Sequence, residues 1–117
     1  MERLKVIFHI NEPERWDTAL GNITNLLKDV GEDGVDAVAI ANGPSVNAFI
    51  DDQKLDVIKG LLDKGVKFFT CRNSLKKMCS TGVCISEESL PSFIGVVPAA
   101  ITEIIKMQAD GFAYVKP

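Results

Sequence analysis

The sequence has few of the residues on which common metal and disulfide sites depend. It contains one histidine and three cysteines in 117 residues. A structural zinc site needs four closely organised ligands, whereas here the cysteines are accompanied only by the distant His9. The odd number of cysteines leaves at least one thiol outside any disulfide, and no Cys-x-x-Cys pair occurs. We therefore expect neither a metal site nor a disulfide framework.

Positive charge and long apolar runs are also scarce. The 13 lysines and arginines are outnumbered by 16 acidic residues, so the net charge is -3 and the sequence lacks the basic surface of nucleic-acid-binding proteins. No apolar run reaches the roughly 18 residues of a membrane span. The charged start leads directly into a strand-like run, without the pattern of a signal peptide. We expect a cytoplasmic protein that binds neither nucleic acid nor membrane.

Signature motifs of nucleotide-binding and hydrolytic proteins are absent from the sequence. It has no Gly-x-Gly-x-x-Gly and no Gly-x-x-x-x-Gly-Lys-Ser/Thr, which disfavours nucleotide binding through a phosphate-cradling loop. Gly-x-Ser-x-Gly is missing too, and His9 would have to serve any Ser/His or Cys/His pair alone. His9 could face a cleft near the end of its strand, although its apolar neighbours favour a buried, hydrogen-bonded histidine. No cofactor is expected.

The sequence does contain the alternating pattern of an α/β protein. With 46% apolar and 25% charged residues, it has the composition of one globular domain over residues 1–117. Apolar runs predict strands over residues 4–10, 35–41, 66–71, 93–97 and 112–115. Helical spacing predicts four helices between them, starting at a capping box in Asn11-Glu-Pro-Glu14, after Asp51 or Asp52, at Arg72, and at Pro98. This order predicts a three-layer α/β/α sandwich with a mainly parallel five-stranded sheet and right-handed crossovers.

Cys71 stands where the strand over residues 66–71 ends and the next helix begins. In an open parallel sheet, sites lie beyond the carboxyl ends of the strands, and the unpaired amides of a helix start favour a thiolate. Arg72 and Asn73 follow directly and are expected to polarise the thiol through charge and helix-start amides. Asn42 and Gly43 form a turn after the strand over residues 35–41. They are expected either to be part of the same cleft wall or to be an ordinary strand-to-helix turn.

A thiolate at this position can accept sulfane sulfur as a persulfide without a metal or organic cofactor. A sulfur carrier that uses Cys71 is therefore the leading hypothesis. Two alternatives stay open. Cys71 could be inert in an oligomeric scaffold or small-ligand-binding protein, or it could form a redox pair with Cys79 or Cys84. Those two cysteines lie in the stretch over residues 79–91, which is predicted to be the most mobile loop.

Three stretches resemble the DsrE/DsrF-like family of small sulfur-metabolism proteins, and the resemblance extends over nearly the whole chain. They are Val66-Lys-Phe-Phe-Thr-Cys-Arg-Asn-Ser-Leu75, Ala41-Asn-Gly-Pro44, and the tail from Val97-Pro-Ala-Ala to Pro117. The resemblance implies a compact DsrE/F-like fold and homo- or hetero-oligomers of trimer or hexamer type, here a homotrimer or homohexamer. It also implies a sulfurtransferase-like relay from a donor protein to an acceptor protein through a persulfide on Cys71. Sulfur-relay members follow this cysteine with small residues and Arg-Gly, so the chain resembles the stand-alone branch more closely.

Overall fold

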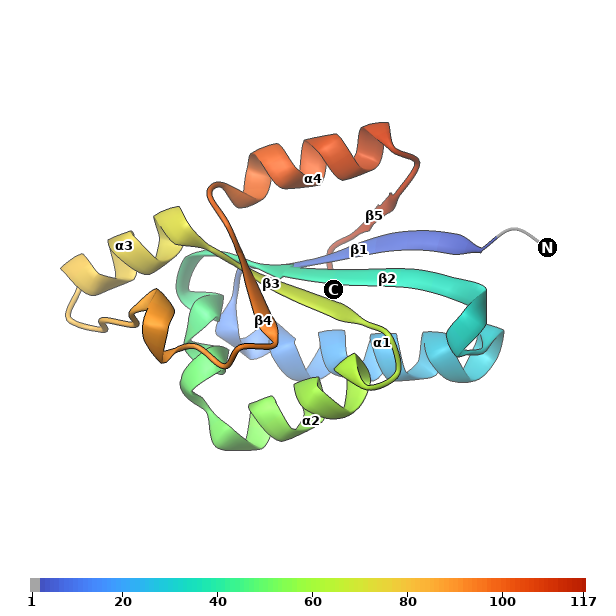
Figure 1. The fold of residues 1–117 in the computed structure, drawn as a ribbon, viewed down its shortest axis with the longest axis horizontal. Coiled ribbons are helices and arrows are strands. Elements are labelled where there is room, and N and C mark those ends of the chain that lie inside the picture. Colours follow the sequence, from blue (N-terminus) through green and yellow to red (C-terminus); the bar gives the residue numbers. More distant parts are fainter. Residues whose placement is uncertain (1–2) are drawn as a thin grey trace.

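One sheet organises residues 3–117, the part of the chain that the computed structural model describes (Figure 1). Its strands are β1 (Leu4–Ile10), β2 (Val35–Ala41), β3 (Lys67–Cys71), β4 (Ile94–Val97) and β5 (Ala113–Val115). They are hydrogen-bonded in the order β4-β3-β2-β1-β5, and every pair is parallel. The predicted five-stranded parallel sheet is confirmed, although β3, β4 and β5 each begin one residue later than predicted. The carboxyl ends of all these strands therefore meet at one edge.

The helices form a layer on each face of this sheet. They are α1 (Trp16–Val30), α2 (Asp52–Leu62), α3 (Arg72–Ser80) and α4 (Ala100–Ala109). Figure 1 shows α1 and α2 on one face, α4 on the opposite face, and α3 beyond the carboxyl ends of the strands. Short 3-10 helices complete the connections: η1 (Pro13–Arg15), η2 (Glu32–Gly34), η3 (Gly43–Ile50) and η4 (Glu87–Ser89). The predicted three-layer arrangement is confirmed.

The two faces of the sheet carry unequal cores. On the face of α1 and α2, the Trp16 ring meets the Phe49 ring edge-on with 5.7 Å between centroids. The Trp16 Nε1–H donates to the Ser45 carbonyl oxygen at 2.8 Å, so this large ring is both packed and hydrogen-bonded. The smaller core under α4 consists of Ile7, Val38, Ile40, Cys71, Ala100 and Ile104. Cys71 thus belongs to the thinner layer of the protein.

The first helix does not begin with the predicted capping box. Pro13 takes the first position of η1, which places Glu12 at the cap, and Glu12 makes no side-chain cap hydrogen bond. Asn11 therefore lies outside the cap, and its side-chain oxygen is buried without a hydrogen-bond partner in the part of the chain described. The α-helical conformation starts only at Trp16, after this 3-10 turn.

Two later helix starts can also be compared with their predictions. Asp51 caps α2 as predicted, because its side chain accepts hydrogen bonds from the amides of Gln53 and Lys54 at 3.0 and 3.2 Å. Pro98 is not the first residue of α4, which is a correction. The cap of α4 is Ala99, whose backbone is extended, so the first helical residue is Ala100. This shift matters because the Ala100 amide is one of the groups that contact Cys71.

Candidate functional site

Cys71 is both the last residue of β3 and the N-cap of α3. Because side chains alternate along a strand, Phe68 packs into the larger core while Cys71 packs into the smaller core under α4. Its side chain is 4% exposed. The backbone is extended at Cys71 and helical from Arg72, so the first amides of α3 have no partners within the helix. The structure therefore places Cys71 at the strand-to-helix corner that the sequence predicts.

Two helix starts meet at the Cys71 sulfur. Burial, the largest single influence, raises the pKa of the thiol. The Ser74 hydroxyl and the backbone amides of Ser74, Ala100 and Asn73 act in the opposite direction as hydrogen-bond donors, and together they hold the pKa below its usual value. Asn73 and Ser74 are in the first turn of α3, and Ala100 is the first residue of α4. The positive ends of two helix dipoles thus favour a thiolate at this point.

Ser74 connects the Cys71 corner to the loop that follows β2. Its hydroxyl oxygen accepts a hydrogen bond from the Gly43 backbone N–H at 2.7 Å, while its own O–H donates to Cys71. Gly43 has a φ of 59°, and a Cβ there would lie 3.4 Å from the Asn11 carbonyl oxygen, so the turn favours glycine. The sequence-predicted loop is therefore brought to the thiol, with Ser74 as the connecting group that sequence analysis did not single out.

Asn42 lies beside Cys71 on the neighbouring strand. It extends β2 by one residue, and the register that pairs Ala41 with Thr70 places it next to Cys71. Its side-chain oxygen lies 2.9 Å from Nε2 of His9, which stands two residues after Ile7 of the smaller core. Asn42 and Cys71 therefore share one face of the sheet. The role of Asn42 in the wall of a cleft stays a prediction.

His9 is buried, and both of its ring nitrogens are engaged. Nδ1 lies 2.6 Å from the Tyr114 hydroxyl, and the side chain is 6% exposed. Because the amide oxygen of Asn42 can only accept, Nε2 carries the proton and Nδ1 accepts from Tyr114. His9 thus fixes Asn42 rather than serving as a base for Cys71. Tyr114 was not predicted, since a single tyrosine in a three-residue edge strand leaves no distinctive pattern.

Arg72 and Asn73 act differently from what their positions in the sequence suggest. The Arg72 guanidinium forms a bidentate pair with Glu87, from Nε to Oε2 at 2.8 Å and from Nη2 to Oε1 at 3.1 Å. The hydrogen bond to Glu87 raises the pKa of Arg72, and in return lowers the pKa of the Glu87 carboxyl. The charge of Arg72 is therefore engaged away from the thiol, and Asn73 contributes its backbone amide while its side chain is exposed.

The disulfide in the structure is not the one that the redox hypothesis expects. Cys79 and Cys84 form a disulfide with each other, and Cys71 is the free cysteine. A pair between Cys71 and either of them is thus not formed, which corrects that alternative. Cys79 follows Cys71 by eight residues of α3, or about 12 Å of helix at 1.5 Å per residue. The disulfide lies at the opposite end of α3 from the free thiol.

Within residues 3–117, no three side chains of histidine, cysteine, aspartate or glutamate are grouped so that they could hold a metal ion. No helix among these residues is both long enough and apolar enough to cross a membrane.

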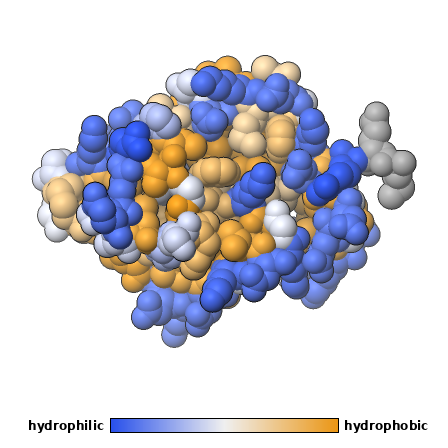
Figure 2. Space-filling view, in the orientation of Figure 1, coloured by the Kyte–Doolittle hydropathy of each residue, from blue (hydrophilic) through white to orange (hydrophobic). Residues whose placement is uncertain are grey.

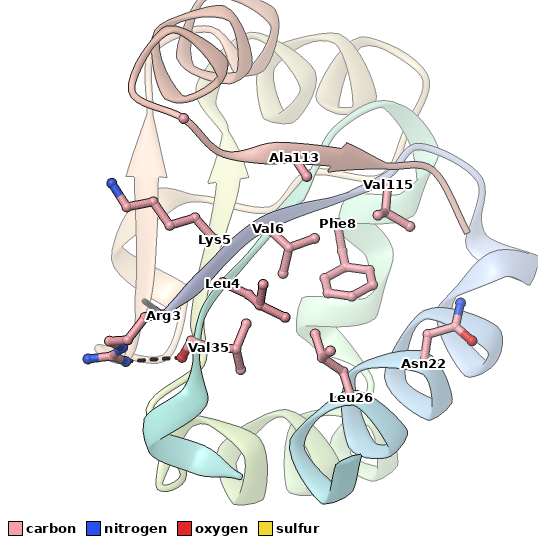
Figure 3. A pocket seen from close by; sticks show the side chains of 11 residues that line it. Arg3, Leu4, Lys5, Val6, Phe8, Asn22, Leu26, Val35, Ala113 and Val115 are labelled. Atoms are coloured by element: carbon pink, nitrogen blue, oxygen red, sulfur yellow. Dashed lines mark hydrogen bonds between the residues drawn. The ribbon is translucent and has the colours of Figure 1, made fainter. Parts of the chain in front are cut away.

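A separate groove lies on the α1 side of the sheet, between this helix and the strands β1 and β5 (Figure 3). Its volume is about 1020 Å³. Val6, Phe8 and Leu26 give it apolar walls, and Asn22 of α1 adds a polar group. Val6 and Phe8 belong to the larger core. The groove therefore opens on the face of the sheet opposite to Cys71.

Apolar side chains are exposed close to the Cys71 corner as well. Ile101 directly follows Ala100 on α4 and is 56% exposed, and Ile105 one turn further is 61% exposed. Figure 2 shows further apolar surface across the middle of the molecule, between α4 and the opposite helix layer, bordered by hydrophilic residues. Exposed apolar patches are typical of surfaces that meet another protein.

The fold and the site define a class of protein: an all-parallel α/β sheet with one free thiol held between two helix starts. The sequence model of the DsrE/DsrF-like family matches residues 7–117. The chain belongs to this family, as the resemblance predicted, and the family is associated with sulfur relay. The chain is also similar to a solved structure, a protein of unknown function from Methanobacterium thermoautotrophicum (MTH1491). The TM-score is 0.83 at 26% identity, over 97% of this chain and 99% of the other. No protein with a curated description matches the sequence.

Proposed function

We propose that this protein is a sulfur carrier, which holds sulfane sulfur as a persulfide on Cys71 and passes it to a partner protein. The observation that carries the proposal is the set of four donors around Cys71, which hold its pKa below the usual value although the thiol is buried. A thiolate is the form that attacks sulfur, so these donors raise the reactive fraction near neutral pH. The association of the family with sulfur relay supports the same function.

The loading step needs no oxidant and no cofactor. The Cys71 thiolate attacks the outer sulfur of a donor persulfide, R–S–SH, and forms a new bond from Sγ to that sulfur. The donor S–S bond breaks, and R–S⁻ leaves. The outer sulfur keeps its proton, so charge and atoms balance. Unloading is the same exchange with an acceptor thiolate as the attacking group, and Cys71 is then the leaving thiolate.

The groups around Cys71 have distinct tasks in this proposal. The Ser74 hydroxyl and the amides of Asn73 and Ala100 stabilise the thiolate before loading and again when it leaves. Asn42 and Gly43 form the adjacent wall, and His9 with Tyr114 fixes the Asn42 side chain. None of these groups has to change protonation state, because the exchange conserves charge.

Donor and acceptor proteins are part of this proposal, as is self-association into a homotrimer or homohexamer. The exposed Ile101 and Ile105 continue directly from the helix start that contacts Cys71. A partner bound on this surface would therefore lie next to the thiol. Because Cys71 is 4% exposed, a donor must approach it closely, at the two helix starts that surround the thiol.

The test is intact-mass analysis after incubation with a low-molecular-weight persulfide. We expect the parent protein to gain one sulfur atom that reduction removes, and Cys71→Ser to gain none. The double variant Cys79→Ser/Cys84→Ser is the matched control, because it removes the other two cysteines and should still load one sulfur. Equal loading of Cys71→Ser and the parent protein would contradict the proposal.

The groove in Figure 3 favours a second candidate function, the binding of a small apolar molecule by a protein in which Cys71 is inert. Its volume of about 1020 Å³ and its apolar walls are typical of small-molecule sites. Leu26→Asp places a charge in this wall and should abolish binding of a fluorescent apolar probe. Val57→Asp, on the exposed side of α2, is the matched control and should leave binding unchanged. If the parent protein binds the probe and Cys71 takes up no sulfur, the results support ligand binding and contradict sulfur carriage.

A further inference from the structure

Cys79 and Cys84 make a second sulfur site, which the sulfur-carrier proposal does not use. Cys79 lies in the last turn of α3, and Cys84 follows it after four intervening residues. Both residues are exposed, in contrast to Cys71. A thiolate in solution can therefore reach this disulfide, and accessible disulfides are the ones that exchange most readily.

The disulfide is the covalent link that holds residues 81–89, here called the strap, against α3, and the amides of Gly82 and Val83 donate to the Cys79 and Met78 carbonyls beside it. Figure 1 shows the strap running beside this helix. Its second link is the Glu87 carboxylate, which pairs with Arg72 at 2.8 and 3.1 Å in the first turn of α3. Between the two links, Ile85 is 5% exposed and belongs to the larger core. The strap is thus attached near both ends of the helix, covalently at one end only.

A small cavity lies between α3 and the strap. Its volume is about 240 Å³, and its lining includes both disulfide-bonded cysteines as well as Arg72, Lys76 and Glu87. The disulfide therefore forms part of a cavity wall as well as of the outer surface. Glu88 also lines the cavity, so its lining carries two positive and two negative side chains.

We propose that the Cys79–Cys84 pair is a redox-active site that exchanges with a dithiol reductant while the protein stays folded. One thiolate of the dithiol attacks a sulfur of the pair, which breaks the Cys79–Cys84 bond and forms a mixed disulfide. The second thiol of the dithiol then displaces the protein sulfur. The pair gains two electrons and two protons, and the reductant becomes a disulfide. Reduction removes the covalent link of the strap and leaves the Arg72–Glu87 pair, Ile85 and the backbone hydrogen bonds of residues 81–83 to hold it.

The test uses full-length Cys71→Ser, in which Cys79 and Cys84 are the remaining cysteines. The folded protein is treated with dithiothreitol without denaturant, alkylated with iodoacetamide and weighed. We expect no alkyl group before reduction, two after it, and none when the reduced protein is freed of reductant and oxidised by air before alkylation. The circular dichroism spectrum should stay unchanged throughout. The control Cys71→Ser/Cys84→Ser should carry one alkyl group under all three conditions.

Two results would overturn the proposal. One is alkylation of both cysteines before any reductant is added, because the pair would then not be a disulfide. The other is reduction that occurs only in denaturant, because the pair would then be structural. The release of the strap has its own measurement, amide hydrogen exchange. Exchange within residues 81–89 should rise about tenfold on reduction while exchange in β1 and β2 stays the same, since only local opening is involved. Unchanged exchange in the strap would contradict its release.

Discussion

Helix α3 has cysteine sulfur at both ends, and the two ends differ in the properties that control a thiol. At its start, Cys71 is 4% exposed and receives hydrogen bonds from two helix starts. At its end, Cys79 and Cys84 are exposed and bonded to each other. The negative end of the helix dipole lies there, which disfavours a thiolate on Cys79. The comparison teaches that the start and the end of one helix give a cysteine different surroundings. The two proposals, sulfur carriage at the start and disulfide exchange at the end, follow from this difference.

The largest expected effect comes from replacing the two exposed cysteines at the end of α3. Cys79→Ser/Cys84→Ser should lower the free energy of unfolding by about 2 kcal/mol, because closing the six-residue loop restricts the unfolded chain. The alkylation rate of Cys71 should stay within about twofold of the parent rate, since its donors are untouched. Chemical denaturation and alkylation kinetics measure the two quantities. A large change in the Cys71 rate would show that the two ends are not independent.

The next effect tests which group activates the buried thiol at the start of α3. Ser74→Ala removes the hydroxyl that donates to Cys71, and the pKa of the thiol should rise. The thiolate fraction near neutral pH should then fall, and alkylation of Cys71 should slow by about tenfold. Ser80→Ala is the control, because the Ser80 hydroxyl is exposed and donates to the Lys77 carbonyl at 2.6 Å. Equal rates in both variants would show that Ser74 does not activate the thiol.

A smaller effect is expected from the group that fixes the cleft wall. Tyr114→Phe leaves Nδ1 of the buried His9 without its hydrogen-bond donor, which should cost about 1 kcal/mol of folding free energy. The Cys71 alkylation rate should change much less than it does in Ser74→Ala, because Tyr114 acts through His9 and Asn42. Thermal unfolding together with alkylation kinetics tests this. A tenfold slower Cys71 reaction would instead place Tyr114 in direct control of the thiol.

The smallest effect is expected at the Arg72–Glu87 pair, which lies between the two sulfur sites. Both side chains are about 40% exposed, so Glu87→Gln should change the melting temperature little at neutral pH. The folded-state pKa of Glu87 is lowered, so its contribution is present at neutral pH and disappears as the pH falls through that pKa. Melting curves of the parent protein and the variant should therefore converge in acid. Divergence toward low pH would contradict the assigned pairing.

Sequence and structure agree best where the pattern is local. The strand ending at Cys71 and the helix starting at Arg72 are encoded by adjacent apolar periodicities, so both the fold and the position of the thiol could be predicted. The contacts between side chains that are distant in the sequence could not be predicted. His9 meets Tyr114 across 105 positions and Asn42 across 33, and both contacts depend on strand order and register.

Side-chain partners nearer in the sequence were also hard to predict. Arg72 adjoins Cys71 in the sequence, but its guanidinium pairs with Glu87, 15 residues later. The donor from Ala100 could be found only once α4 was placed over the smaller core. The cysteine pairing depended in the same way on how the strap turns back along α3. In each case, the path of the folded backbone decides which two side chains meet. Adjacency in the sequence does not decide it.

The most direct test of the account is the ionisation of Cys71 itself. The double variant Cys79→Ser/Cys84→Ser retains a single cysteine, so its thiolate absorbance in the ultraviolet can be followed against pH without interference from other thiols. The triple variant that also carries Cys71→Ser provides the baseline. The account predicts half-ionisation at a pH below the ordinary pKa of a free cysteine. Half-ionisation at or above that value would contradict it, because burial would then outweigh the four donors at the two helix starts.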